Sequence, residues 1–181
     1  SAVHFWALMS LTGRSTADRS LGASQYSDEF DGEVTRSQDS SGVNCQVWVA
    51  LVVQDVVTTL RAAAERAVSC GVPRASVLVD PTHDFGKNTW HSLHLLRRTE
   101  VLAGLGFPLL MALSRKDFVG ETLDLPADER LEGTLAATAV AAWLGARVFR
   151  AHDVAATRRV LDLVSAVRDE TAPAAALRGL A

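Results

Sequence analysis

After residue 46, short apolar runs alternate with longer segments of helical periodicity, and this order constrains the fold more than any other feature of the sequence. In the first helical segment, Gln54–Cys70, apolar side chains recur at helical spacing until Gly71 ends the pattern. Strands are predicted at 76–79, 109–113 and 147–150, and further helices at 88–105, 128–144 and 154–167. Because such alternation indicates parallel strands joined by right-handed crossovers, an α/β fold is expected, either a doubly wound sheet or a barrel.

The N-terminal part of the chain has a different character. Ala7–Ser10 is apolar and strand-like, but residues 10–46 are rich in Ser, Asp, Gly and Thr and show no apolar period. Such a composition buries too little apolar surface to offset the entropy lost on ordering. A long loop or disorder is therefore predicted there.

Length and composition narrow the range of partners. A chain of 181 residues is about one domain, and its net charge of −3 argues against an electrostatic nucleic-acid partner. The longest apolar run, Val47–Val53, is far shorter than the roughly 20 residues of a membrane helix. The two cysteines, Cys45 and Cys70, form no disulfide framework and are predicted to pack as small hydrophobic residues in a reducing, cytoplasmic setting.

Polar side chains follow each of the three predicted strands. The clusters are Asp80–Lys87, Ser114–Asp117 and Arg150–Asp153. In barrels and open α/β sheets alike, ligands bind where the carboxyl ends of the strands meet. The three clusters are therefore predicted to form one site.

The side chains in these clusters favour a planar ligand that carries phosphate. The Asp80 carboxylate can accept two N–H donors from one edge of a heterocycle, and Phe85 can stack on its ring. Lys116 and Arg150 suit an anion such as phosphate or pyrophosphate, and the His152 imidazole follows Arg150 closely. The residues alone predict a pocket for a phosphorylated heterocycle.

Four segments follow one another with the order and spacing of a family pattern. Asp80–Lys87 is D-P-T-H-D-F-G-K, close to D-P-G-x-G-F-G-K, and Ser114–Lys116 is S-R-K. Glu129–Ala136 matches E-R-L-x-G-[ST]-L-A, and Arg150–Val154 matches R-x-H-D-V. By these motifs the chain resembles the dihydropteroate synthases of the pterin-binding family over about residues 52–170.

The resemblance implies an α/β fold that is the C-terminal part of a (β/α)8 TIM-like barrel. The family motifs of the first five strands are not found in residues 1–51. Because such a barrel takes about 250 residues, an incomplete barrel is expected. The resemblance divides the chain into an unmatched, partly disordered leader at 1–51, a pterin-binding domain at 52–170 and a tail at 171–181.

The resemblance also implies a role in substrate binding for each matching residue. Asp80 is expected to bind the N–H groups of the pterin ring, and Phe85 to line the pterin slot. Ser114 is expected to shape the p-aminobenzoate pocket. Ala112, two residues earlier, takes the place of a glycine that lies beside the pterin.

The catalytic residues that the resemblance implies are Lys116, Arg150 and His152. Lys116 would contact the pterin and the p-aminobenzoate, while Arg150, with His152, would hold the pyrophosphate leaving group. The expected reaction is a transfer in folate biosynthesis, in which p-aminobenzoate displaces pyrophosphate from hydroxymethyl-dihydropterin pyrophosphate. Mg²⁺ is implied as a cofactor that neutralises the leaving charge, although the usual asparagine contact is not found. A homodimer through residues near 130–165 is implied as well.

Three residues depart from the family pattern. Thr82 and Asp84 stand where the family has glycines, and so does Ala112. An added methyl group can overfill a pocket, and a carboxylate at Asp84 is expected to raise one of the two pKa values of the Asp80–Asp84 pair. These changes indicate a divergent paralogue.

Two other functions fit the same residues. The chain can be a non-catalytic paralogue, or a fragment that needs a partner chain, and bind a pterin or phosphate ligand. It can instead be another pterin-binding barrel, such as a methyltetrahydrofolate methyltransferase, although the S-R-K and R-x-H-D-V motifs favour the synthase. His91 and His94 share one helix face, as metal ligands can, but they are predicted to be surface residues because no further ligand has suitable spacing.

Overall fold

The computed structural model describes residues 7–10 and 45–178, with side chains from residue 51 onward. The first described elements are strand β1 (Ala7–Ser10), helix α2 (Cys45–Ser69), strand β2 (Val77–Asp80) and the helices α3 (Thr89–Arg97) and α4 (Thr99–Ala103). Strand β3 (Leu110–Met111), helix α5 (Asp117–Leu123), helix α6 (Leu131–Trp143), strand β4 (Val148–Phe149) and helix α7 (Val154–Val167) follow. Short 3-10 helices, η1 (Arg74–Ser76) and η2 (Ala127–Glu129), precede β2 and α6.

The described strands are all parallel. β1 pairs with β2, with Ser10 opposite Asp80, and β3 pairs with β4. A single parallel bridge between Val79 and Leu109 joins the two pairs. The predicted parallel strands with helical connections are therefore confirmed, and the strand-like segment Ala7–Ser10 is a strand. The predicted loop at 10–46 lies mostly outside the described residues, although Cys45 and Gln46 already belong to α2.

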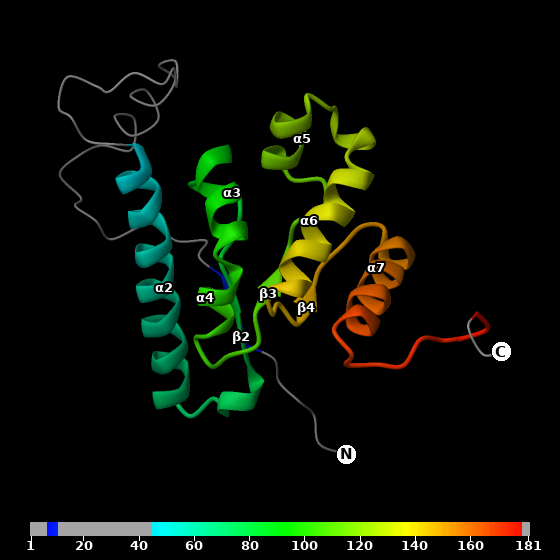
Figure 1. Cartoon of the computed structure of the whole chain (residues 1–181). Helices are drawn as coiled ribbons and strands as arrows, with labels where there is room; N and C mark the ends of the chain where they lie inside the picture. Colours follow the sequence, from blue (N-terminus) through cyan, green and yellow to red (C-terminus); the bar gives the residue numbers. More distant parts are fainter. Residues whose placement is uncertain (1–6, 11–44, 179–181) are drawn as a thin grey trace.

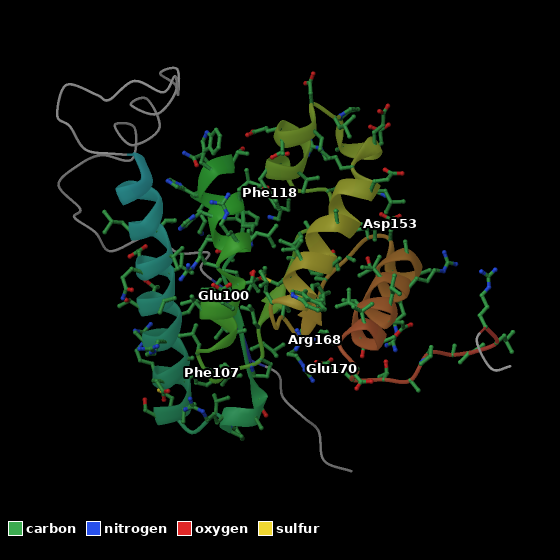
Figure 2. The ribbon with its side chains drawn as sticks, in the orientation of Figure 1. Glu100, Phe107, Phe118, Asp153, Arg168 and Glu170 are labelled. Atoms are coloured by element: carbon green, nitrogen blue, oxygen red, sulfur yellow. The ribbon has the colours of Figure 1, made fainter. Side chains whose placement is uncertain are left out.

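Helices pack against one face of these strands to form the core. In the view of Figure 1, α2 lies beside α3 and α6 lies beside α7, with the strands between the two pairs of helices. Leu60 of α2 and Val79 of β2 are fully buried in this core, as is Leu95 of α3. Phe118 is buried where α5 meets α3 (Figure 2).

The other face of the strands carries a smaller apolar cluster. Leu78, Leu110 and Ala112 are buried there, and Val148 packs against them. These residues alternate along the strands with those of the main core, because successive strand side chains point to opposite faces. The side chain two residues after each of these apolar residues therefore points to the same face of the sheet as they do, at the carboxyl ends of the strands.

Several predicted boundaries are corrected by the structure. α2 begins at Cys45 rather than Gln54, and β3 and β4 are two residues long. The predicted helix at 88–105 is broken at Arg98 into α3 and α4. At this break the buried Thr99 hydroxyl donates a 2.7 Å hydrogen bond to the carbonyl of Leu96, a local bond that competes with the helical ladder.

Further elements differ from the expected pattern for identifiable reasons. α6 begins at Leu131 rather than Asp128, because the residues after Pro126 form the 3-10 helix η2. α5 was not predicted, since its seven residues are too few to show a helical period. The bounds predicted for the last helix, 154–167, are confirmed by α7.

One side chain predicted to be buried lies at the surface. Cys70 is exposed at the end of α2, so the prediction that it packs as a small hydrophobic residue is wrong. Trp143 of α6 is also at the surface, where it is 52% exposed. None of the helices in the described part of the chain is long and apolar enough to cross a membrane.

Candidate functional site

The strand alternation places three predicted site residues on one face at the carboxyl end of the sheet. Asp80 follows Leu78 by two residues, Ala112 follows Leu110, and Arg150 follows Val148. A cavity of about 410 Å³ opens at the ends of β3 and β4. It is lined by Ala112, Ser114, Lys116, Arg150, Ala151 and His152. Five of the seven predicted site residues are thus brought together in one cavity.

Asp80 lies at the end of β2 and does not line this cavity, but it interacts electrostatically with Arg150 and Lys116, which do. The residue is 7% exposed, and its Oδ1 accepts a 2.8 Å hydrogen bond from the backbone N–H of Thr82. Burial raises the pKa of the Asp80 carboxyl, while the Thr82 hydrogen bond and the charges of Arg150 and Lys116 act in the opposite direction. Burial is the largest cause of the raised pKa, and the Asp84 carboxylate, expected to raise one pKa of the pair, is not among the causes for Asp80.

Lys116 connects the cavity with the loop that follows β2. Its Nζ donates a 2.8 Å hydrogen bond to the carbonyl of His83 and lies 4.1 Å from the centroid of the Phe85 ring. Burial lowers the pKa of the Lys116 ammonium, and Arg150 lowers it further, whereas the carboxylates of Asp84 and Asp80 raise it. Phe85 therefore contacts the cation of the site rather than lining the cavity itself.

Ser114 and His152 join the ends of β3 and β4. The Ser114 Oγ lies 2.9 Å from His152 Nδ1 and accepts a 3.2 Å hydrogen bond from the backbone N–H of His152. Beside this pair, the Arg115 guanidinium forms a 3.1 Å ion pair with Asp153. Figure 2 shows Asp153 at the start of α7. These contacts fix the positions of two cavity-lining side chains relative to each other.

Arg130 and Thr134 organise the loop that carries Lys116, a role that the sequence did not reveal. The Thr134 hydroxyl accepts a 3.0 Å hydrogen bond from the backbone N–H of Arg115, which has a φ of 58°. Arg130 Nη1 donates to the Arg115 carbonyl at 3.1 Å and to the Asp117 carboxylate at 2.8 Å. Both residues belong to the segment that matches E-R-L-x-G-[ST]-L-A. This match singled them out in the sequence but did not indicate that their partners lie in the loop after β3.

The described histidines outside the cavity belong to the β2–α3 loop and to α3. His83 is fully buried in the β2–α3 loop, with its Nε2 lacking a hydrogen-bond partner among the described residues. His91 and His94 are half-buried on α3, and the side chain of Asn88, the N-cap of this helix, accepts a 2.9 Å hydrogen bond from the backbone N–H of His91. Among the side chains that the structure describes, no group of three or more His, Cys, Asp or Glu could hold a metal ion.

The described residues also do not suit the Mg²⁺ that the resemblance implies. Mg²⁺ prefers oxygen ligands, chiefly carboxylates and water. The charged side chains that line the cavity are the cations Lys116 and Arg150, which repel a divalent metal ion.

Comparison with known proteins places these features in a family. The family model described as pterin binding enzyme matches residues 35–152. Over 130 residues, the chain is 61% identical to a Mycobacterium leprae protein and 59% identical to one from Mycobacterium tuberculosis strain H37Rv, both named inactive dihydropteroate synthase 2. These alignments cover 72% of this chain but only 45% and 41% of the two relatives.

A solved structure shares the described fold. The Coxiella burnetii dihydropteroate synthase in complex with pteroic acid aligns with a TM-score of 0.64 at 29% identity. The alignment covers 68% of this chain and 46% of that one. The chain thus spans less than half the length of these relatives.

These comparisons correct one expectation and confirm another. The prediction of an active dihydropteroate synthase is contradicted, because the relatives near 60% identity are named inactive. The resemblance drawn from the four motifs, to a divergent paralogue of the synthases, is confirmed. Since the family model matches more than half of its residues, the chain belongs to the pterin-binding enzyme family.

Proposed function

We propose that this chain is a non-catalytic pterin-binding protein, which holds a pterin or a phosphate-bearing ligand at the carboxyl ends of its strands. The observation that carries the proposal is the buried Asp80 carboxylate, whose electrostatic neighbours include Arg150 and Lys116. A carboxylate can accept paired N–H donors from a heterocycle, while the two cations suit an anionic group. Phe85, Ala112, Ser114 and His152 complete the proposed site, and Lys116, Arg150 and His152 hold the anion without turnover.

The proposal includes an architecture. The described strands form the C-terminal part of a (β/α)8 barrel, in which β1 and β4 each have one neighbouring strand among those described. A closed barrel needs eight strands, and open edges favour pairing with other strands. The remaining strands come from chain outside the described residues or from a partner chain. A homodimer and a cytoplasmic setting belong to the same proposal.

Calorimetric titration with pteroic acid tests the proposal, because a family member binds this compound. Saturable binding is expected, and Asp80→Asn is expected to weaken it at least about tenfold, since one oxygen acceptor becomes an N–H donor. Asp80→Asn removes a charge that burial disfavours, so the variant should fold. Asp128→Asn, at an exposed carboxylate in η2, controls for the change in net charge.

A second arm of the experiment addresses catalysis. Pyrophosphate release from the dihydropterin pyrophosphate and p-aminobenzoate is expected to stay at background. The absence of saturable pteroic acid binding to the folded wild-type chain would refute pterin binding. Equal affinities of the wild type and Asp80→Asn would refute the role assigned to the carboxylate.

A further inference from the structure

The loop between β2 and α3 adopts a conformation that its residues disfavour. Thr82 has a φ of 49° and Asp84 a φ of 68°, both in the left-handed region. Residues with a Cβ atom pay a conformational cost there, and a β-branched residue such as threonine pays more than most. Contacts outside the loop must therefore hold it in place.

Asp84 provides these contacts. Its Oδ2 accepts hydrogen bonds from the backbone N–H groups of Asp117, at 2.7 Å, and Phe118, at 3.4 Å, where α5 begins. Its Oδ1 accepts a 3.0 Å hydrogen bond from the Ser92 hydroxyl on α3, and the Ser92 Oγ accepts a 3.1 Å bond from the Asp84 N–H. These four bonds, called here the Asp84 contact, tie the loop to two helices.

The neighbours of Asp84 in the loop engage Lys116. The carbonyl of His83 accepts the hydrogen bond from Lys116 Nζ, and the ring of Phe85 lies against the same ammonium. Lys116 directly precedes α5. Because the Asp84 contact ties the loop to the start of α5, it brings the loop carbonyl and the Phe85 ring close to the Lys116 ammonium. An ammonium has three N–H donors, and the loop carbonyl and the ring compete for them with any ligand in the cavity.

The second lysine of the region is engaged by the same loop. Lys87 Nζ donates hydrogen bonds to the carbonyls of Thr82, at 3.2 Å, and Phe85, at 3.1 Å. Asp84 also places a negative charge near Lys116, which reduces the positive potential offered to an anion. The ammonium groups of Lys116 and Lys87 are thus both directed toward backbone carbonyls of the loop.

We infer that the Asp84 contact is autoinhibitory: it holds the loop Thr82–Lys87 against α5, keeps Lys116 bound to the loop, and so weakens the binding of an anionic pterin. The inference rests on the proposed function. Asp84 is a positioning residue that acts through Lys116. At its position the resembling family has glycine, which forms no such contact.

Asp84→Gly tests the inference, because glycine adopts a positive φ without the cost that aspartate pays. In this variant, hydrogen exchange of the Asp117 and Phe118 amides, followed by NMR, is expected to become about tenfold faster. The affinity for pteroic acid, measured by calorimetry, is expected to rise about tenfold. Ser92→Ala, which removes one side of the contact, should shift both quantities in the same direction by less. Asp128→Gly, the control at an exposed carboxylate, should shift neither.

The outcomes separate the inference from the proposed function. If the wild type and Asp84→Gly bind pteroic acid with equal affinity, the autoinhibitory role is overturned while pterin binding stands. Unchanged exchange at Asp117 and Phe118 overturns it as well. If neither protein binds pteroic acid, the proposed function fails, and the inference fails with it. If Asp84→Gly does not fold, Ser92→Ala decides by the same two measurements.

Discussion

The imidazole of His83 is an ionisable group held in an apolar environment. It is 1% exposed, and its ring lies 5.8 Å from that of Phe118. Burial, together with the charges of Lys87 and Lys116, lowers the pKa of His83 from 6.5 to about 3. The folded protein therefore favours the neutral imidazole, and no proton-transfer role follows from this residue near neutral pH.

This pKa predicts a loss of stability in acid. Because the unfolded chain binds the proton near pH 6.5 and the folded chain only near pH 3, the stabilising effect is complete above pH 6.5 and is lost as the pH falls toward 3. At about 1.4 kcal/mol per pH unit, the free energy of unfolding should fall by about 3 kcal/mol between pH 6.5 and pH 4. His83→Leu should remove most of this dependence.

Urea unfolding at several pH values measures the effect. His94→Leu on α3 is the control, because it makes the same substitution at a histidine that is only half-buried. This variant should keep most of the pH dependence of the wild type. If His83→Leu keeps the pH dependence of the wild type, the assignment of the acid sensitivity to His83 is wrong.

Two glycines allow α5 and α6 to approach each other closely near the site. A Cβ atom on Gly133 of α6 would lie 2.6 Å from side-chain atoms of Leu123 and Val119 on α5. On α5 itself, a Cβ atom on Gly120 would lie 2.2 Å from the Arg130 guanidinium. The glycines of the S-R-K-D-F-V-G and E-R-L-E-G segments therefore serve packing that keeps the Lys116 loop in place.

Gly133→Ala is expected to lower the free energy of unfolding by about 1–3 kcal/mol, because the buried Val119 side chain must move. This overpacking cost should exceed the gain of up to about 1 kcal/mol that alanine brings to a helix. Ala136→Gly, at an exposed position of the same helix, isolates helix propensity and should cost about 1 kcal/mol. An increase in stability of Gly133→Ala, measured by urea unfolding, would contradict this account of the contact.

On the scale of the whole molecule, the helices at the C-terminal end present several large apolar side chains to solvent. Trp143 is 52% exposed on α6, and Leu163 is 65% exposed on α7. Figure 2 shows Arg168 and Glu170 at the end of α7, where they form a 2.8 Å ion pair. The homodimer through residues near 130–165 stays a prediction. Substitution of the exposed apolar side chains in this range tests it.

A dimer is expected in light scattering, and Leu163→Glu should convert it to a monomer because a buried charge at the interface would lack a partner. Leu177→Glu, at a residue that is 88% exposed in the C-terminal tail, is the control and should leave the dimer intact. A wild-type chain that is monomeric throughout the measured concentration range would refute the prediction.

The sequence alone determined the features that depend on neighbouring residues. The alternation of strands and helices, the parallel pairing and the bounds of α7 follow from local periodicity and chain connectivity. The positions of Asp80, Lys116 and Arg150 near strand ends are likewise local, since each lies within a few residues of an apolar run. Four short motifs were sufficient to indicate the family.

The tertiary structure decided what residues distant in the sequence do to one another. The seven residues of α5 show no helical period of their own, and the carboxylate that accepts from its first N–H groups belongs to Asp84, 33 residues before Asp117. Arg130 was placed at the Lys116 loop only by folding, since its partners include the Arg115 carbonyl. Asp84 was expected to perturb Asp80, but folding directs its carboxylate to α5 and α3. Local patterns report which elements form, whereas hydrogen bonds between them depend on the distances and directions that only packing sets.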